Sequence, residues 1–307
     1  MTTAFITHAH CFKHDMGATH PERPARLAAI EDQLIASGIA GLVERHEAPR
    51  AALAELMRVH PQGYIDSIHA ASPARGMAHL DPDTALCPFT WDAALHAAGA
   101  GVLGADLVMS GGADNAFCSV RPPGHHATRD RAMGFCFFNN IAVAAMHALE
   151  HHGLARVAIV DFDVHHGNGT EDIFSDDPRV VMVGSFQHPF YPYSGDLDAA
   201  RNMLNVPLKA GSGGQAFRQA VEAVWLPALE AHQPQMVFIS AGFDAHLEDD
   251  MAGLRFTEAD YAWVTKKVKG VAERYGEGRI VSMLEGGYAL SALGRSVVAH
   301  LRVLGGL

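Results

Sequence analysis

The stretch VAIVDFDVHHGNG, residues 157–169, decides the fold of this 307-residue chain. It opens with four apolar residues, two of them valines and one an isoleucine, and then changes to aspartates, histidines and glycines. A short apolar run rich in β-branched residues is typical of a buried strand in a parallel sheet. Because open parallel sheets bind ligands beyond the carboxyl ends of their strands, we expect the polar residues to belong to a binding site.

Similar apolar runs recur along the chain and predict further strands at 4–7, 116–120, 180–183, 236–240 and 279–284. Helical patterns lie between these strands, at 24–36, 90–109, 138–151, 214–231, 257–274 and 290–304. This alternation predicts an α/β fold with a mainly parallel sheet and helices on both faces. No repeat or linker-like run interrupts the pattern, so we expect a single domain over residues 1–307.

Composition argues against several classes of protein. The formal net charge is -11, whereas a general binder of nucleic acid or of an anionic membrane needs a basic surface. No signal peptide is visible at the N-terminus, and no apolar run approaches the roughly 18 residues of a membrane span. The four cysteines are not spaced like a disulfide framework or a zinc knuckle. We therefore expect a cytoplasmic protein with free thiols at Cys11, Cys87, Cys118 and Cys136.

Five predicted strands are followed by polar loops that contain glycine, histidine or acidic residues. These loops are RPPGHH, DFDVHHGNG, GSFQH, AGFDAH and EGGY, in chain order. Since the carboxyl ends of parallel strands lie at one edge of a sheet, the loops should converge on one site. In RPPGHHA, residues 121–127, two prolines and a glycine predict a rigid loop that holds His125 and His126 in a fixed place.

The DFDVHHGNG loop contains candidate metal ligands. If the strand continues past residue 161, Asp161, Asp163 and His165 share one face, and Asp163 and His165 can bind one ion together. A carboxylate and an imidazole suit zinc, and an open zinc site needs about three protein ligands. Asp244 follows another predicted strand and is the expected third ligand. His166 should point the other way, which indicates a structural role.

Several motifs together resemble those of the histone deacetylase family. They are RPPGHHA, GFCFFNN (134–140), DFDVHHGNG, SAGFD (240–244) and LEGGY (284–288), and they occur in the family's order. The resemblance runs from THPERPARL (19–27) to the last predicted helix and is stronger to the class II branch and its bacterial relatives. It implies an arginase/deacetylase fold, with a narrow tunnel that leads to a catalytic zinc ion. It also implies hydrolytic removal of acetyl or other acyl groups from N-acetylated amines, above all acyl-lysine side chains of peptides or proteins.

The resemblance also implies roles for individual residues. The zinc ligands would be Asp163, His165 and Asp244. His126 would be the general base and acid, with His125 as its electrostatic neighbour, Asp161 orienting His125, and Tyr288 polarising the substrate carbonyl. A structural potassium ion would lie near Asp161, Asp163, His165, Ser185 and Phe186. The tunnel would be formed by Phe135 and Tyr191, with the backbone carbonyl of Gly134.

Some positions bear on specificity. Asn168 stands where class I relatives have an aspartate, so it can hold the His126 ring without adding negative charge. Met251 stands where polyamine-specific relatives have a gatekeeping glutamate, and Asp250 replaces the family's usual proline. Asp81 and Asp83 are candidates to grip a peptide backbone or are turn residues. Arg23 is a candidate for an acetate exit route or a salt bridge.

Three other functions use parts of the same pattern. An acetylpolyamine or other small-amide deacetylase would need negative charge at the tunnel rim, and Met251 argues against it. An arginase-like ureohydrolase would need a two-metal carboxylate cluster. A catalytically silent module that binds acyl groups would be expected to lack His126 or Tyr288, and both are present. The family resemblance is compatible with an oligomer.

Overall fold

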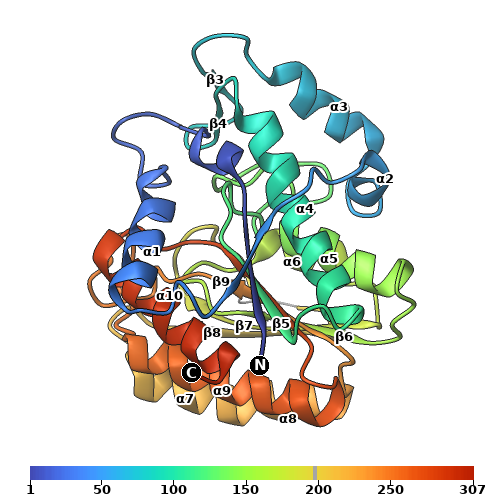
Figure 1. Ribbon diagram of the computed structural model, residues 1–307, viewed down its shortest axis with the longest axis vertical. Coiled ribbons are helices and arrows are strands. Elements are labelled where there is room, and N and C mark those ends of the chain that lie inside the picture. The colour runs from blue at the N-terminus through green and yellow to red at the C-terminus, as the bar shows by residue number, and fades with distance from the viewer. Residues whose placement is uncertain (196–198) are drawn as a thin grey trace.

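The computed structural model describes residues 1–195 and 199–307 and contains a large parallel sheet (Figure 1). Its strand order is β2-β1-β5-β10-β9-β6-β7-β8, and every neighbouring pair is parallel. The strands are β1 (Thr3–Thr7), β2 (Glu44–Glu47), β5 (Asn115–Cys118), β6 (Val157–Asp161), β7 (Val180–Gln187), β8 (Met203–Leu208), β9 (Val237–Ala241) and β10 (Ile280–Leu284). A short antiparallel pair, β3 (Ala78–His79) and β4 (Ala85–Leu86), lies outside this sheet.

Helices cover both faces of the sheet, as the sequence predicts (Figure 1). The helices are α1 (Ala25–Ala36), α2 (Leu53–Leu56), α3 (Gln62–Ala71), α4 (Thr90–Met109), α5 (Asn140–Glu150), α6 (Asn168–Phe174), α7 (Gly214–Ala220), α8 (Leu226–His232), α9 (Glu258–Tyr275) and α10 (Leu290–Gly305). The 3-10 turn η1 (Ala9–Phe12) follows β1, and the π-helical segment η2 (Val221–Trp225) joins α7 to α8. Helices α4 and α5 pack together on one face, and α9 packs against α8 and α10 on the other.

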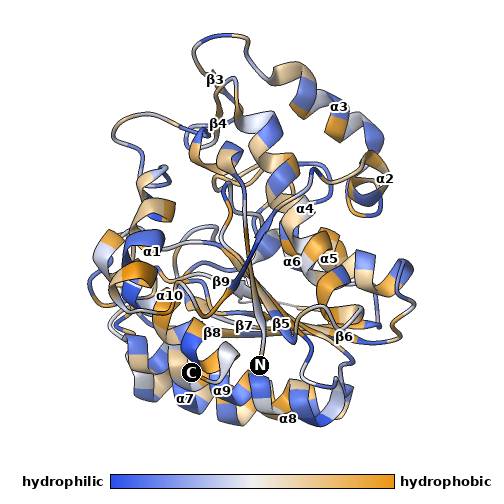
Figure 2. Ribbon diagram, in the orientation of Figure 1, coloured by the Kyte–Doolittle hydropathy of each residue, from blue (hydrophilic) through white to orange (hydrophobic). Residues whose placement is uncertain are grey.

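The predicted strands all form, but two strands at the edges of the sheet were not predicted. β2 has the sequence ERHE, and β8, MLNVPL, is only partly buried. Each pairs on one side only, so neither needs the continuous apolar pattern that marks the inner strands. The inner strands β5, β6, β9 and β10 are buried throughout and contribute to the core between the two helical layers. Figure 2 colours the ribbon by the hydropathy of each residue.

Local sequence explains where several helices begin. The Asn139 side chain accepts a hydrogen bond from the Ala142 backbone N–H at 3.0 Å, so α5 begins after the asparagine. Helix α9 begins with a capping box, in which Asp260 accepts hydrogen bonds from the backbone N–H and the hydroxyl of Thr257 at 2.9 Å.

In the described residues, none of the helices combines the length and apolar character needed to cross a membrane.

Candidate active site

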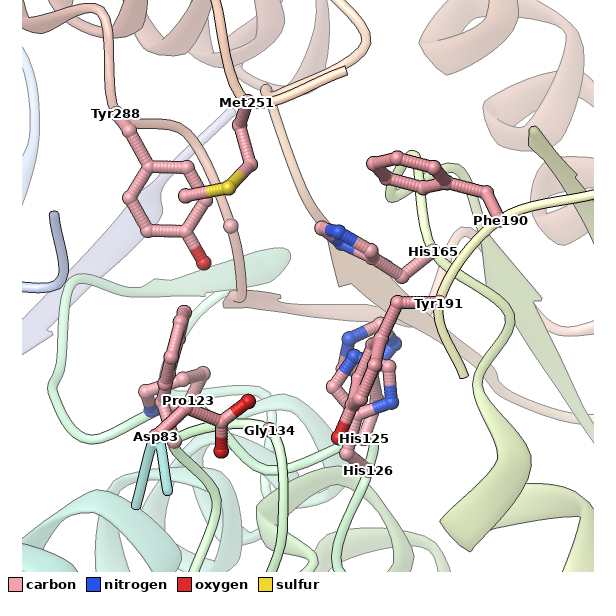
Figure 3. Close-up of a pocket in the computed structure, with 12 residues that line it drawn as sticks. Asp83, Pro123, His125, His126, Gly134, His165, Phe190, Tyr191, Met251 and Tyr288 are labelled. Carbon is pink, nitrogen blue, oxygen red and sulfur yellow. The ribbon is translucent and has the colours of Figure 1, made fainter. Parts of the chain in front are cut away.

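A cavity of about 220 Å³ opens at the carboxyl edge of the sheet (Figure 3). Loops that follow β5, β6, β7, β9 and β10 all contribute to its wall, as the sequence predicts. The lining residues are Asp83, Pro123, His125, His126, Gly134, Phe135, His165, Phe190, Tyr191, Met251, Gly286 and Tyr288. Apart from Asp83, which precedes α4, they belong to the loops that carry the motifs singled out in the sequence.

Asp163, His165 and Asp244 meet beside this cavity, and His165 lines it. They are buried, and one potential ligand atom from each lies within 4.8 Å of the others. Nδ1 of His165 is 2.9 Å from Asp163 Oδ1 and 3.3 Å from Asp244 Oδ2. Burial and the neighbouring Asp163 raise the pKa of Asp244 to about 6, because two carboxylates here share little solvent. A cation bound beside His165 would reduce the repulsion between the Asp163 and Asp244 carboxylates.

The strand does not continue past Asp161, so the predicted strand alternation is wrong in detail. β6 ends at Asp161, and the chain turns through local side-chain bonds instead. Asp161 Oδ1 accepts the Asp163 N–H at 3.0 Å, and Asp163 Oδ1 accepts the His165 N–H at 2.8 Å. These are Asx-type turns, which aspartate favours over extended strand once the ladder ends. They still direct Asp163 and His165 to one place.

The carboxylates of the trio are fixed by backbone donors. Asp163 Oδ2 accepts the Gly286 N–H at 2.8 Å, and Asp244 Oδ1 accepts the Val164 N–H at 2.9 Å. Asp244 Oδ2 is buried and has no hydrogen-bond partner among the described residues. A buried oxygen without a donor is unfavourable unless something else satisfies it. The two oxygens and one imidazole nitrogen therefore fit a divalent transition-metal ion such as zinc, with room on the cavity side.

His125 and His126 lie against each other with ring centroids 4.1 Å apart. His125 Nδ1 is 2.9 Å from Asp161 Oδ2, as the resemblance implies. Burial alone would lower the pKa of His125, but the charges of Asp161 and Asp163 outweigh it and raise that pKa well above its usual value. His125 thus contributes positive charge at the side of its neighbour.

His126 differs from His125 in its partner. Its Nδ1 is 2.7 Å from Asn168 Oδ1, at the start of α6. An amide oxygen only accepts, so Nδ1 carries the proton and Nε2 keeps the lone pair. Burial, reinforced by the charges of His125 and His165, holds the pKa of His126 well below its usual value. The ring is neutral and lines the cavity, which is the state that a general base requires.

Glu285 anchors the loop that carries His125 and His126, a role that its sequence motif did not predict. Its Oε2 accepts the N–H groups of Gly124 and His125 at 2.7 and 3.2 Å, and its Oε1 accepts the Ser240 hydroxyl at 3.2 Å. Burial raises the pKa of Glu285 to about 7. The signal was its position in LEGGY directly after a buried strand, but its partners in the histidine loop lie 160 and 161 residues away in the chain.

Tyr288 reaches the cavity from the loop after β10, and its hydroxyl points into the cavity (Figure 3). Burial raises the pKa of Tyr288 well above its usual value, so the hydroxyl stays protonated and can donate. Asp249 Oδ2 accepts the backbone N–H groups of Tyr288 and Ala289 at 2.6 and 3.0 Å. Behind the ring lies the Arg26 guanidinium, 4.9 Å from the ring centroid.

Arg26, and not Arg23, is the arginine beside the site. Arg23 is exposed, whereas Arg26 is fully buried and donates to the Gly287 and Glu285 carbonyls at 2.6 and 2.5 Å. Arg26 also pairs with Glu22 at 3.1 Å. Both arginines occupy one short motif, and Arg26 is the one whose side chain reaches the loop after β10. The exit-route role suggested for Arg23 stays a prediction.

Of the residues predicted to form the tunnel, Phe135, Tyr191 and Gly134 line the cavity, and Phe190 lines it as well. The Tyr191 ring is 5.3 Å from the His126 ring, and Phe190 stacks on His165 at 5.4 Å. Phe135 faces Tyr288 at 6.1 Å across the cavity. Gly134 has a φ of +56°, and a Cβ there would lie 2.4 Å from the His126 ring, so only glycine fits.

The two aspartates near the rim have different roles. Asp81 Oδ1 accepts the N–H groups of Asp83 and Thr84 at 3.0 and 2.6 Å, which makes it a turn former. Asp83 lines the cavity and is half-buried. Burial and the nearby Asp81 raise its pKa. Of the two candidates, Asp83 is the one that can reach a ligand in the cavity.

Met251 lines the cavity, whereas the acidic residues before it do not. Glu248 pairs with Arg295 at 2.6 Å, and Asp249 turns inward to the Tyr288 backbone. Asp250, in the position of the usual proline, is exposed. The apolar rim expected from Met251 is therefore not replaced by these neighbours.

The residues predicted to hold potassium lie at the ends of β6 and β7. Asp161 and Ser185 are buried at 2% exposure, as is Phe186, and β6 pairs with β7 up to Asp161 and Gly184. The Ser185 hydroxyl has no hydrogen-bond partner among the described residues. A buried hydroxyl without a hydrogen-bond partner suits oxygen coordination of a cation.

His166 has the structural surroundings that the sequence indicates, and Cys136 is also a packed residue outside the cavity. His166 bonds Ser194 through Nδ1 at 2.9 Å and Glu171 through Nε2 at 2.7 Å, so both of its nitrogens are occupied. Cys136 is fully buried, and burial raises the pKa of its thiol well above the usual value. Neither residue lines the cavity.

Comparison with known proteins gives a consistent result. The model of the histone deacetylase domain matches residues 20–304. A histone deacetylase-like amidohydrolase of Pseudomonas aeruginosa is 39% identical over 279 residues, which cover 89% of this chain and 73% of that protein. A probable deacetylase of Archaeoglobus fulgidus is 35% identical, with 94% and 82% covered. The crystal structure of the HDA15 HD domain superposes with a TM-score of 0.94 at 35% identity, covering 99% of this chain and 88% of that one.

Proposed function

Since the chain belongs to the histone deacetylase family, we propose that it is a zinc-dependent amidohydrolase that removes acetyl groups from acyl-lysine side chains. The observation that carries the proposal is the meeting of the Asp163, His165 and Asp244 trio with His126 and Tyr288 around one cavity. These groups come from four loops, after β5, β6, β9 and β10, and amide hydrolysis needs all of them within reach of one carbonyl.

Asp163, His165 and Asp244 would hold the zinc ion. When bound there, zinc would polarise the substrate carbonyl and make a water molecule more acidic. The donor set of two oxygens and one nitrogen also suits iron(II) or cobalt(II). The trio has its backbone bonds already formed, so little rearrangement is needed for an ion to bind.

The protein's own groups would move the protons. His126 Nε2 would take a proton from the attacking water and deliver it to the departing lysine nitrogen, a role worth about 10²–10⁴-fold in rate. Asn168 fixes the tautomer that this requires. The Tyr288 hydroxyl would donate to the carbonyl oxygen as negative charge develops there, worth about 2.7–4 kcal/mol. His125, held by Asp161, would keep positive charge beside the reacting centre.

The walls of the cavity would select the substrate. Phe135, Tyr191 and Met251 offer an apolar passage for a lysine methylene chain, and the Gly134 carbonyl would accept an amide N–H near the reacting group. Asp83 would accept hydrogen bonds from a peptide backbone at the mouth. We further propose a structural potassium ion near Asp161, Asp163, His165, Ser185 and Phe186, which the unsatisfied Ser185 hydroxyl supports.

A substrate panel tests the proposal. Acetate release by the zinc-loaded protein is measured with acetyl-lysine peptides, trifluoroacetyl-lysine and acetylputrescine. Turnover of the lysine substrates with little release from acetylputrescine is the expected result. The reverse preference would favour the small-amide alternative on the same machinery. Binding of these substrates without any release would contradict the proposal and favour a silent acyl-binding module.

Asp163→Ala tests the metal assignment separately. Removal of one buried ligand should abolish stoichiometric zinc binding at this site, because the remaining two ligands leave the ion under-coordinated. The matched control is Asp81→Ala, which alters a carboxylate of the rim turn. Metal content by mass spectrometry should fall in the first variant and stay unchanged in the second. Unchanged zinc at the site in Asp163→Ala would overturn the ligand assignment.

A further inference from the structure

Three histidines outside the active site meet where β1 ends. His8 and His10 flank the start of η1, and His96 faces them from α4. One potential ligand nitrogen from each lies within 4.8 Å of the others. The His8 and His96 rings stack with centroids 3.5 Å apart and an interplanar angle of 12°, and His10 is 5.3 Å from His96. Imidazoles therefore gather here without a carboxylate among the three.

The hydrogen bonds leave lone pairs available on His96 and His10, whereas the Nδ1 lone pair of His8 is engaged. His96 Nδ1 is 2.8 Å from the Ala48 carbonyl, which only accepts, so Nδ1 carries the proton and Nε2 keeps its lone pair. This is the arrangement by which proteins orient metal-binding histidines. His10 Nδ1 is buried and has no hydrogen-bond partner among the described residues. His8 Nδ1 accepts the His10 backbone N–H at 3.1 Å, so its lone pair also lies at the cluster.

The surroundings of these three histidines favour a metal ion that prefers nitrogen ligands. Burial and the neighbouring imidazoles lower the pKa of His8 and of His96, so both rings are neutral near pH 7. The charged groups that act on them are Glu47, Lys13 and Arg50. A site with this mixed charge does not suit magnesium or calcium, which require oxygen ligands. It suits zinc, nickel(II) or copper(II), which imidazole binds directly.

A second histidine cluster provides a contrast. Asp106, His147, His151 and His152 also lie within 4.8 Å of one another. There, Arg58 donates to His147 Nδ1 at 2.9 Å, so the proton of His147 sits on Nε2 and is donated to Asp106 Oδ1 at 2.7 Å. His152 Nε2 contacts the same oxygen at 2.7 Å. Hydrogen bonds explain this cluster without a metal ion, and the nearby guanidinium opposes one.

We propose that His8, His10 and His96 bind a divalent transition-metal ion such as zinc at a site separate from the catalytic centre. On binding, the His8 ring turns out of its stack with His96, and its lone pair goes to the ion in place of the hydrogen bond from the His10 backbone. The site is linked to the active-site loop, because the Cys11 and His14 carbonyls accept from Arg121 Nη1 at 2.8 and 2.9 Å. Arg121 begins RPPGHH, so an ion in this site braces the turn that holds the loop.

Metal stoichiometry tests this proposal. The protein with its catalytic site filled is titrated with ZnCl₂, and binding is measured by calorimetry. We expect a second equivalent in the wild type. Loss of an outer-sphere partner typically weakens metal binding by about 10–100-fold, so loss of a direct ligand in His10→Ala or His96→Ala should weaken the second equivalent by at least about 100-fold. The first equivalent should remain in both variants.

The double variant His151→Ala/His152→Ala is the matched control and should keep both equivalents. Retention of the first equivalent and an unchanged circular dichroism spectrum establish that the variants are folded. His10 is only partly buried, so His10→Ala is the variant least affected by a loss of packing. A single equivalent in the wild type would overturn the proposal. So would a second equivalent that survives both His10→Ala and His96→Ala, or one that disappears in the control.

Discussion

His60 and His126 are both buried, yet their ring nitrogens have different surroundings. His60 Nδ1 bonds the Arg129 carbonyl and Nε2 accepts the Asn139 N–H, both at 2.9 Å. His300 in the core is similar, with Thr265 at 2.6 Å and Ser282 at 2.9 Å. In His126, Asn168 takes the Nδ1 proton, and the ring lines a cavity with the Nε2 lone pair still available.

The difference separates histidines that hold the fold from histidines that can react. All three rings are neutral because burial lowers their pKa. Neutrality is therefore not what marks a catalytic histidine. What matters is whether the second nitrogen is used by a protein group or is left facing a space that a substrate can enter. This criterion, and not burial, separates His126 from His60 and His300.

The largest expected effect tests the reactive member of the pair. His126→Ala should lower turnover of an acetyl-lysine peptide by at least about 100-fold, because no other group replaces the proton carrier. The zinc content should not change. His60→Gln is the control and should keep turnover within a few-fold once folded. Turnover is measured by steady-state kinetics and zinc content by metal analysis for both variants. Comparable losses of turnover in the two would contradict the distinction between His126 and His60.

The next prediction concerns stability and pH. Burial lowers the pKa of His60 to about 4, from 6.5 when unfolded. Between these values the unfolded chain binds the proton and the folded chain does not, so stability falls as pH drops from about 6.5 to 4. The full contribution is about 3 kcal/mol. The free energy of unfolding, measured with urea at pH 7 and pH 5, should fall more between these pH values for the wild type than for His60→Gln. An equal fall in both proteins would show that His60 does not remain neutral.

Asn168→Asp sharpens the comparison by changing only the charge on the His126 partner. A carboxylate in place of the amide favours the protonated imidazole and raises the pKa of His126 by about one unit or more. The acid limb of the kcat/KM profile should therefore move to higher pH. Asn168→Ala is the companion variant, because it removes the anchor without adding charge. An acid limb that stays in place in Asn168→Asp would argue against His126 as the base.

The smallest effect is expected at Met251, on the rim of the cavity, which takes no part in the proton transfer proposed for His126. Met251→Glu should raise the ratio of acetylspermidine to acetyl-lysine turnover by about five- to tenfold, because a partly exposed carboxylate attracts the cationic chain only modestly. Glu248→Gln is the control, since Glu248 already pairs with Arg295. Competition assays with both substrates measure the ratio. An unchanged ratio in Met251→Glu would remove Met251 from the determinants of specificity.

The sequence predicts the sheet and the converging loops well, because buried strands and strand-end motifs are local patterns. Asp163, His165 and Asp244 come together as predicted, although Asx turns and not a continuing strand direct the first two. The supporting residues were not predictable in the same way. Glu285 and Arg26 act on groups 160 or more residues away, and such partners leave no periodic signal in the sequence.

The hydrogen bonds of Asp249 limit how this protein can be redesigned. One of its oxygens bonds the backbone of Tyr288 and Ala289, and the other accepts the Met251 N–H at 3.1 Å. The backbone at Met251 and at Tyr288 is thus held by a single carboxylate. The side chain at position 251 can be exchanged while these hydrogen bonds stay intact, but insertions or deletions in the loop that contains Asp249 and Met251 would disturb both. Libraries aimed at new substrates should accordingly vary side chains there and keep the loop length and Asp249 constant.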